Sequence, residues 1–155
     1  MSNWKQIILA IILSLLFCSA CGSGTEGTGQ ADPNASNDNV SFIKVSVNDS
    51  YYESKDNNIE EPPVWYVKSG TDVVAEIVNN GSLKHNWAIV KKGHKISIPY
   101  NGGEESDILL YRVGMLYKNN QTMAAFTAPE PGEYLVICTV TDHYPYMQGV
   151  LRVEE

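Results

Sequence analysis

The chain has 155 residues, which gives room for one domain with a hydrophobic core and excludes two. Its 11 Lys and Arg residues against 18 Asp and Glu give a net charge of −7. This acidic balance argues against nucleic acid as a partner, because phosphates are bound by clustered basic side chains. Nine tyrosines, twelve glycines and seven prolines, together with many Val and Ile residues, favour an all-β domain over a helical bundle.

Residues 1–20 have the features of an export signal. The apolar run over 7–17 is too short to span a bilayer but fits the apolar region of a secretory signal. Two small residues then precede Cys21, as in a bacterial lipobox, although Cys18 stands where such signals usually have Leu. We expect a signal peptide over 1–20, a lipid on Cys21, and an anchor on the extracytoplasmic side of a bacterial membrane, in the periplasm or at the cell surface. Cleavage without lipidation, which would leave a soluble exported protein, is the alternative.

Residues 21–40 are rich in Gly, Ser, Thr, Asn and Asp and predict a flexible tether ahead of a domain over 41–155. Once Cys18 is removed and Cys21 is acylated, Cys138 is the only thiol in an oxidising compartment and has no intramolecular disulfide partner. Coordination to a metal ion would both protect and use this thiol.

Short runs rich in β-branched and aromatic residues, separated by turn signals, predict the strands of the domain. In 71–78 apolar residues alternate with others, so one face of that strand is wholly apolar, whereas 134–138 is apolar on both faces, as a central strand requires. The turn at 131–134 resembles a tyrosine corner. A Greek-key β-sandwich is therefore expected, with strands at 41–47, 64–68, 72–79, 86–91, 122–127, 133–139 and 149–153.

Residues 104–118 follow a different pattern. Apolar residues between Ile108 and Leu116 recur at near-helical spacing, and acidic residues suited to a helix N-terminus precede them. We predict a short helix or flap inserted between the two halves of the sandwich.

The segment from Cys138 to Met147 carries the strongest chemical signal, because it offers a thiolate, an imidazole at His143 and a thioether within ten residues. These soft-to-borderline ligands suit copper better than oxygen-preferring ions or structural zinc. A trigonal copper site needs one further imidazole, and His85 supplies it from the sequence Lys-His-Asn-Trp.

The Cys-x4-His-x3-Met motif with an upstream His-Asn-Trp resembles the cupredoxins, the small blue (type 1) copper proteins, and is closest in spacing to their azurin and auracyanin branch. The resemblance covers about 40–155. It implies that one copper ion is held by His85, Cys138 and His143, with Met147 as a weak axial ligand. It also implies a monomeric one-electron carrier, not an enzyme, that docks transiently with a redox donor and a redox acceptor. With the anchor expected at Cys21, this carrier would be membrane-tethered.

The resemblance extends to the surroundings of the ligands. Asn86 matches the residue whose backbone N–H bonds the Cys sulfur and whose side chain ties two loops together, and Thr139 matches its hydroxylated partner. Lys84 stands where azurins have a Gly whose carbonyl approaches the metal, which leaves that fifth contact open. The expected electron exit and partner-docking surface is the edge of His143 with its aromatic neighbours Tyr144, Pro145 and Tyr146.

Rival functions are weaker. Copper nitrite reductases and multicopper oxidases need several more His residues than the three present, a binuclear copper loop needs two Cys residues, and a Cys-His hydrolase needs a third orienting group. We expect the third His, His94, to be solvated among lysines and outside the site. Two alternatives stay open: a copper chaperone or buffer without an electron-transfer role, and a metal-free adhesion domain on the same sandwich.

Overall fold

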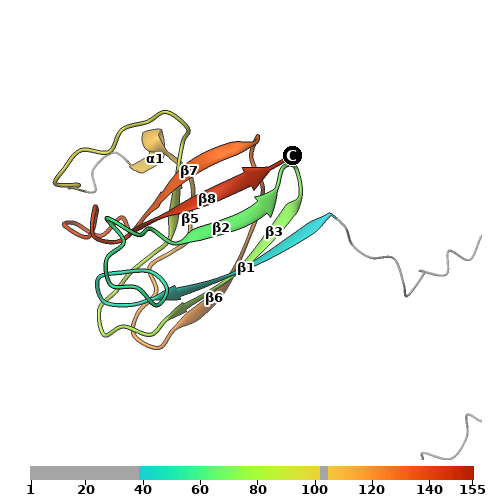
Figure 1. Cartoon of the computed structure of the whole chain (residues 1–155). Helices are drawn as coiled ribbons and strands as arrows, with labels where there is room; N and C mark the ends of the chain where they lie inside the picture. The colour runs from blue at the N-terminus through green and yellow to red at the C-terminus, as the bar shows by residue number, and fades with distance from the viewer. Residues whose placement is uncertain (1–38, 102–104) are drawn as a thin grey trace, which may run out of the picture. The chain divides into compact units, whose positions relative to one another are not determined.

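The computed structural model describes residues 39–101 and 105–155, which fold into eight strands and one helix of four residues (Figure 1). The predicted signal peptide, most of the predicted tether and Cys21 lie outside the described residues. The strands are β1 (Val40–Val47), β2 (Val64–Lys68), β3 (Asp72–Asn79), β4 (Ala88–Val90), β5 (Leu109–Arg112), β6 (Gln121–Thr127), β7 (Gly132–Ile137) and β8 (Gln148–Glu154), and the helix is α1 (Glu105–Ile108).

The strands form two sheets that face each other (Figure 1). One sheet has three strands in the order β1-β3-β6, and the other has five in the order β2-β8-β7-β4-β5. β1 pairs with β3 and β2 pairs with β8 in parallel, while the remaining pairs are antiparallel. The expected all-β sandwich is confirmed, and its non-sequential strand order is that of a Greek key.

Alternation along the strands builds the core between the sheets. In β3 the side chains of Val73, Ala75 and Ile77 are completely buried, and the side chains between them face outward. Each large apolar side chain removed from water in this way contributes roughly 1.5–3 kcal/mol. The same inward set continues on the facing sheet, where Val136 and Leu151 are completely buried.

The tyrosine corner predicted at the start of β7 is confirmed. The Tyr134 hydroxyl donates a hydrogen bond of 2.8 Å to the Glu130 carbonyl, and the Tyr134 ring lies in the core. Because β7 ends immediately before Cys138, this anchor also fixes the strand that delivers the thiol.

The helix predicted over 104–118 is wrong beyond one turn. Leu109–Arg112 instead form β5, which pairs antiparallel with β4, and Leu116 pairs with His85 through an isolated β-bridge. Without β5 the short β4 would be an edge strand with unpaired backbone N–H and C=O groups. Pairing with that edge outweighs the weak helical periodicity of the segment.

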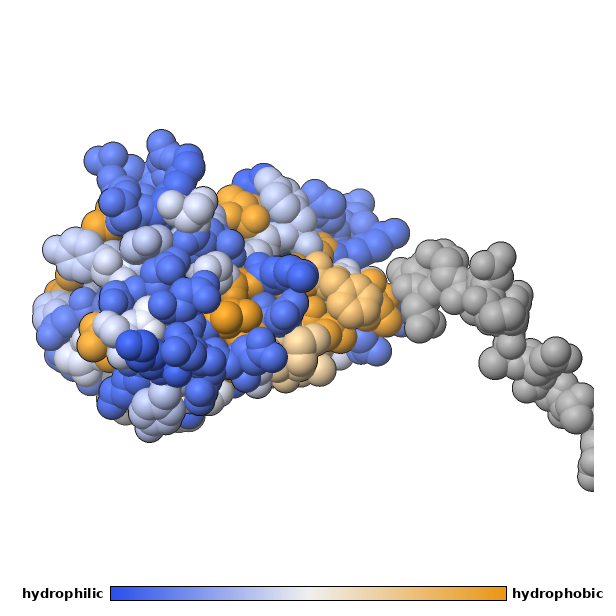
Figure 2. Space-filling model, turned by 90° about the horizontal axis from the view of Figure 1, so that it is seen from below, coloured by the Kyte–Doolittle hydropathy of each residue, from blue (hydrophilic) through white to orange (hydrophobic). Residues whose placement is uncertain are grey.

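The outer face of the three-stranded sheet is mixed in character. Figure 2, which views the molecule from the side of that sheet, shows a mostly hydrophilic surface interrupted by small apolar patches. Phe42 and Met123 are its most exposed large apolar side chains, and an ion pair between Lys44 and Glu76 lies on the same sheet. Among the described residues, no helix has the length and apolar character needed to cross a membrane.

Candidate metal centre

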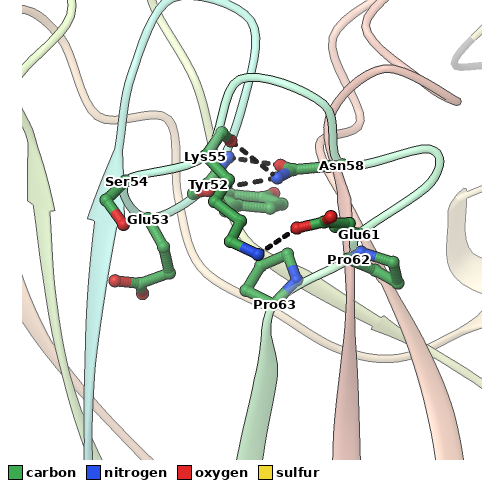
Figure 3. Close-up of a pocket in the computed structure, with 8 residues that line it drawn as sticks. All are labelled: Tyr52, Glu53, Ser54, Lys55, Asn58, Glu61, Pro62 and Pro63. Atoms are coloured by element: carbon green, nitrogen blue, oxygen red, sulfur yellow. Dashed lines mark hydrogen bonds and ion pairs between the residues drawn. The ribbon is translucent and has the colours of Figure 1, made fainter.

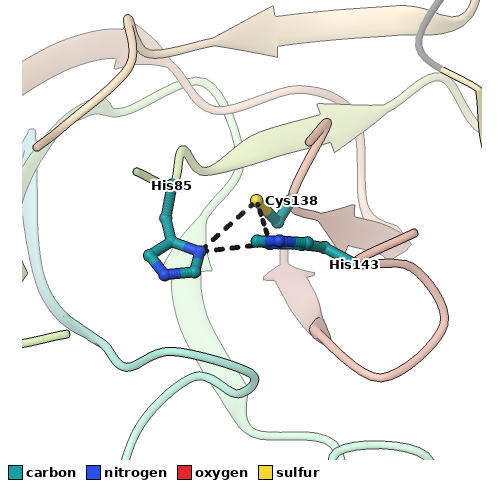
Figure 4. A group of neighbouring side chains, drawn as sticks. All are labelled: His85, Cys138 and His143. Carbon is teal, nitrogen blue, oxygen red and sulfur yellow. Dashed lines mark hydrogen bonds between the residues drawn. The ribbon is translucent and has the colours of Figure 1, made fainter. Parts of the chain in front are cut away.

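Three donor side chains from two distant segments of the chain meet at one end of the sandwich (Figure 4). Cys138 directly follows β7, His143 lies in the loop that joins β7 to β8, and His85 lies just before β4. The bridge between His85 and Leu116 holds the backbone of His85 through hydrogen bonds of 3.0 and 2.8 Å. His85 and Cys138 are thus fixed at the ends of paired segments, and His143 is carried by the loop between two strands.

The donor atoms have the spacing that a metal ion requires. Nδ1 of His85 lies 3.2 Å from Nδ1 of His143, and Sγ of Cys138 lies 3.9 and 3.5 Å from these two nitrogens. A point equally far from the three atoms would lie about 2.1 Å from each, which matches bonds of about 2.0–2.3 Å from a metal to imidazole nitrogen and thiolate sulfur. The three residues therefore fit a trigonal transition-metal site.

Met147 lies beside this triad at the end of the same loop and is completely buried. Its N–H donates to the His143 carbonyl at 2.8 Å, and its carbonyl accepts the N–H of Cys138 at 3.2 Å. The loop therefore folds back on itself and brings its Cys, His and Met residues together. Two imidazoles, a thiolate and a thioether form the set that trigonal electron-transfer copper sites use.

The thiol of Cys138 is completely buried beside the two imidazoles. Burial raises its pKa, and hydrogen bonds from the backbone N–H groups of Asn86 and Val140 partly offset that rise. The thiol therefore keeps its proton near neutral pH until a cation replaces it. These N–H groups would stabilise the thiolate once it has formed.

The surroundings of both imidazoles favour the neutral form, in which a ring nitrogen can bind a metal ion. Burial lowers the pKa of His85, and the neighbouring His143 lowers it further. Burial also lowers the pKa of His143, although Asp142 acts in the opposite direction. Neutral imidazoles expose a nitrogen lone pair to a metal without first losing a proton.

Asn86 ties the two ligand-bearing segments together. Its side-chain amide donates to the Thr139 hydroxyl at 2.7 Å and accepts the Thr139 N–H at 2.8 Å, and both residues are buried. The sequence predicted this pair, and the structure brings it together next to His85 and Cys138.

Tyr52 adds a support that the sequence did not reveal. Its hydroxyl donates to the Asn86 carbonyl at 2.7 Å from a completely buried position. Tyr52 also lines a pocket in the connection from β1 to β2 (Figure 3). There the side-chain amide of Asn58 accepts a hydrogen bond from the backbone N–H of Tyr52 and donates one to its carbonyl. None of the four predicted ligands lines this pocket, whose walls are formed by Tyr52, Glu53, Ser54, Lys55, Asn58, Glu61, Pro62 and Pro63.

The loop residues around His143 form a partly exposed rim. His143, Tyr144 and Pro145 are half-buried, and Tyr146 is 61% exposed. One ligand is therefore accessible at the surface while the other three are buried.

Lys84, predicted next to the site, and His94, predicted outside it, both lie at the surface. Lys84 is exposed. Whether its carbonyl would contact the metal stays a prediction. His94 is exposed and is not among the three clustered donors.

Sequence reasoning missed Asp49, Tyr52 and Val140 as neighbours of the ligands. The first two lie in and beside the turn after β1, more than thirty residues before His85, and only the tertiary fold brings them to it. Val140 is different, because it lies only two residues after Cys138 and its backbone N–H is within local reach of the sulfur.

No family model matches the chain. Among characterised proteins it is similar to auracyanin-A of Chloroflexus aurantiacus, with 35% identity over 102 residues that cover 56% of this chain and 62% of that protein. The chain thus spans less than two thirds of the length of this relative.

Solved structures show the same architecture. Auracyanin A of Chloroflexus aurantiacus, described as a "blue" copper protein, superimposes with a TM-score of 0.61 and 26% identity, covering 74% of this chain and 99% of that structure. An azurin from Methylomonas sp. strain J gives a TM-score of 0.56 at 16% identity over 74% of this chain and 98% of that structure, which supports the fold alone.

Proposed function

We propose that the chain is a cupredoxin, by its fold and by the donor atoms gathered at one end of it, and that it binds one copper ion and carries single electrons between redox proteins. The observation behind this proposal is the convergence of Nδ1 of His85, Sγ of Cys138 and Nδ1 of His143 on a common point. Met147 completes the proposed ligand set. When bound, copper supplies a one-electron couple between its monovalent and divalent states.

The chain's own part is to hold the donors rigidly. The loop from Cys138 to Met147 is closed by its own backbone hydrogen bonds, and the Asn86–Thr139 pair locks it to the segment that carries His85. A donor set held this firmly has little freedom to rearrange when the charge at its centre changes. Low rearrangement favours fast electron transfer without a substrate bound at the site.

The rim around His143 is the proposed contact for redox partners. Three ligands are buried, so the half-exposed ring of His143 offers the shortest covalent route from the site to the surface. Its neighbours Tyr144, Pro145 and Tyr146 add a small aromatic surface, which suits the brief, weak docking of electron-transfer partners.

A copper chaperone or buffer is the second candidate, and the burial of the donors argues against it. Handing over a metal ion is easiest from an open, exposed set of ligands. Here His85, Cys138 and Met147 have no exposed surface. A closed site of this kind suits retention of the ion better than its release.

The test is the colour of the copper-loaded protein. One equivalent of Cu(II) should give an intense blue or green absorption from charge transfer between thiolate and copper, with a matching EPR spectrum. Cys138→Ala should abolish the colour, whereas His94→Ala, which changes an exposed His outside the site, should retain it. A colourless wild-type protein, or a coloured Cys138→Ala variant, would refute the assignment.

We also propose that a lipid on Cys21 tethers the domain to a membrane, supported by the sequence around that residue. β1 begins at Val40 and runs toward the metal end, so its eight residues place the entry of the tether about 25 Å from that end. An unmodified Cys21 in the mass spectrum of the native protein, or release from membranes without detergent, would contradict this lipid anchor.

A further inference from the structure

The imidazole of His85 has one ring nitrogen that the metal site does not use. Its Nδ1 faces Cys138 and His143, while its Nε2 is buried without a hydrogen-bond partner. An imidazole that keeps a lone pair on Nδ1 must carry its proton on Nε2. The unused nitrogen is therefore a buried N–H donor, and a buried donor without an acceptor is costly.

The group that faces this N–H is the carboxylate of Asp49. Oδ1 of Asp49 lies 3.7 Å from Nε2 of His85, which makes the pair an electrostatic contact, longer than the roughly 2.9 Å of a hydrogen bond. Asp49 stands in the turn after β1, 36 residues before His85, so the contact depends on the fold.

The carboxylate is held in place by the segment that leads to His85. Its Oδ1 accepts the N–H groups of Ser82 and Leu83 at 2.5 and 2.9 Å, and its Oδ2 accepts the Ser82 hydroxyl at 2.8 Å. Gly81 leaves room for it, because a Cβ at that position would collide with Oδ1. All three of these N–H and O–H groups donate to Asp49, which matches an ionised carboxylate that only accepts hydrogen bonds.

We propose that Asp49 is a positioning residue for the metal centre: its fixed carboxylate faces the Nε2–H of His85, selects the tautomer with a free Nδ1, and turns that nitrogen toward Cys138 and His143. The inference rests on the proposed function, since it assigns Asp49 a role toward the same site. A carboxylate behind a ligating imidazole makes the imidazole a stronger donor, and loss of such a partner typically lowers metal affinity 10–100-fold. Its negative charge also favours divalent over monovalent copper.

The experiment compares Asp49→Asn with Asp56→Asn. The Asn side chain keeps an oxygen for the N–H groups of Ser82 and Leu83 and removes the charge together with the acceptor of the Ser82 hydroxyl, so the segment before His85 should stay folded. Asp56→Asn makes the same change in net charge at an exposed position on the following loop. Relative to this control, Asp49→Asn should weaken Cu(II) binding about tenfold or more and raise the midpoint potential. Equal affinity and potential in the two variants would overturn the proposal.

A second measurement needs no copper. ¹⁵N chemical shifts of the imidazole in the metal-free protein report which nitrogen carries the proton. His85 should be protonated on Nε2 in the wild type and should populate both tautomers in Asp49→Asn; an unchanged tautomer would refute the role of Asp49. If the wild type fails to develop colour with Cu(II), the proposed function is wrong, and these shifts still decide whether Asp49 orients the ring.

Discussion

The hydrogen bonds between Asn86 and Thr139 give the sharpest quantitative prediction about the site. Both residues are buried, and their two bonds of 2.7 and 2.8 Å join the segment of His85 to that of Cys138. Thr139→Val keeps the shape of the side chain but leaves one amide N–H of Asn86 without an acceptor, which should cost about 1–3 kcal/mol of unfolding free energy. Asn86→Ala removes both bonds and leaves two groups of Thr139 unsatisfied, so we expect a loss of about 2–5 kcal/mol.

The double variant decides whether these bonds act as one unit. With Asn86 already replaced, Thr139→Val breaks no bond and removes a buried hydroxyl that has lost its partner. Its further cost should be close to zero, which corresponds to a coupling energy of about 1–3 kcal/mol. Urea unfolding of the metal-free proteins measures all four stabilities, provided that the slope of free energy against urea stays unchanged.

A matched control separates general stability from the metal site. Ser41 bonds the Thr71 hydroxyl at 2.9 Å near the start of β1, far along the strand from the metal end, so Ser41→Ala should cost about 1 kcal/mol and leave the copper spectrum unchanged. Thr139→Val should shift that spectrum, because it loosens the segment that orients the thiolate. Strictly additive costs for Asn86→Ala and Thr139→Val, or a Thr139→Val variant as stable as the wild type, would refute the reasoning.

Three further outcomes are expected. Met147→Leu should retain copper and raise the reduction potential, because the thioether is proposed as a weak axial ligand; loss of copper, measured by metal analysis, would count against that role. Tyr134→Phe should lower the free energy of unfolding by about 1–2 kcal/mol without altering the copper spectrum, since it removes only the bond to the Glu130 carbonyl; a changed spectrum would show that the corner acts on the site. Copper affinity should rise about tenfold per pH unit between pH 7 and pH 8. Burial raises the pKa of the Cys138 thiol, which must lose its proton to bind copper, and lowers the pKa values of both imidazoles, which are already neutral. Calorimetry in buffers of different ionisation enthalpy should find one proton released per ion, and a pH-independent affinity would contradict this expectation.

Much of the fold follows from local patterns in the sequence. The strands predicted at 64–68 and 72–79 are observed with the same bounds, because apolar residues at every second position specify both the strand and its buried face. The close spacing of Cys138, His143 and Met147 likewise identified the loop as a metal-binding segment. These features depend on residues within about ten positions of one another.

Other features depend on which segments meet in space. β5 was mistaken for a helix because its pairing with β4 joins segments about twenty residues apart, and the unpaired edge of β4 has no signature in residues 109–112. The direction of the His85 ring was equally hidden. Residue types along the chain determined which metal the protein is suited to. The tertiary structure decided that Asp49 would contact His85 and that Tyr52 would bond the carbonyl of Asn86. Contacts across more than thirty residues arise only when the two sheets pack.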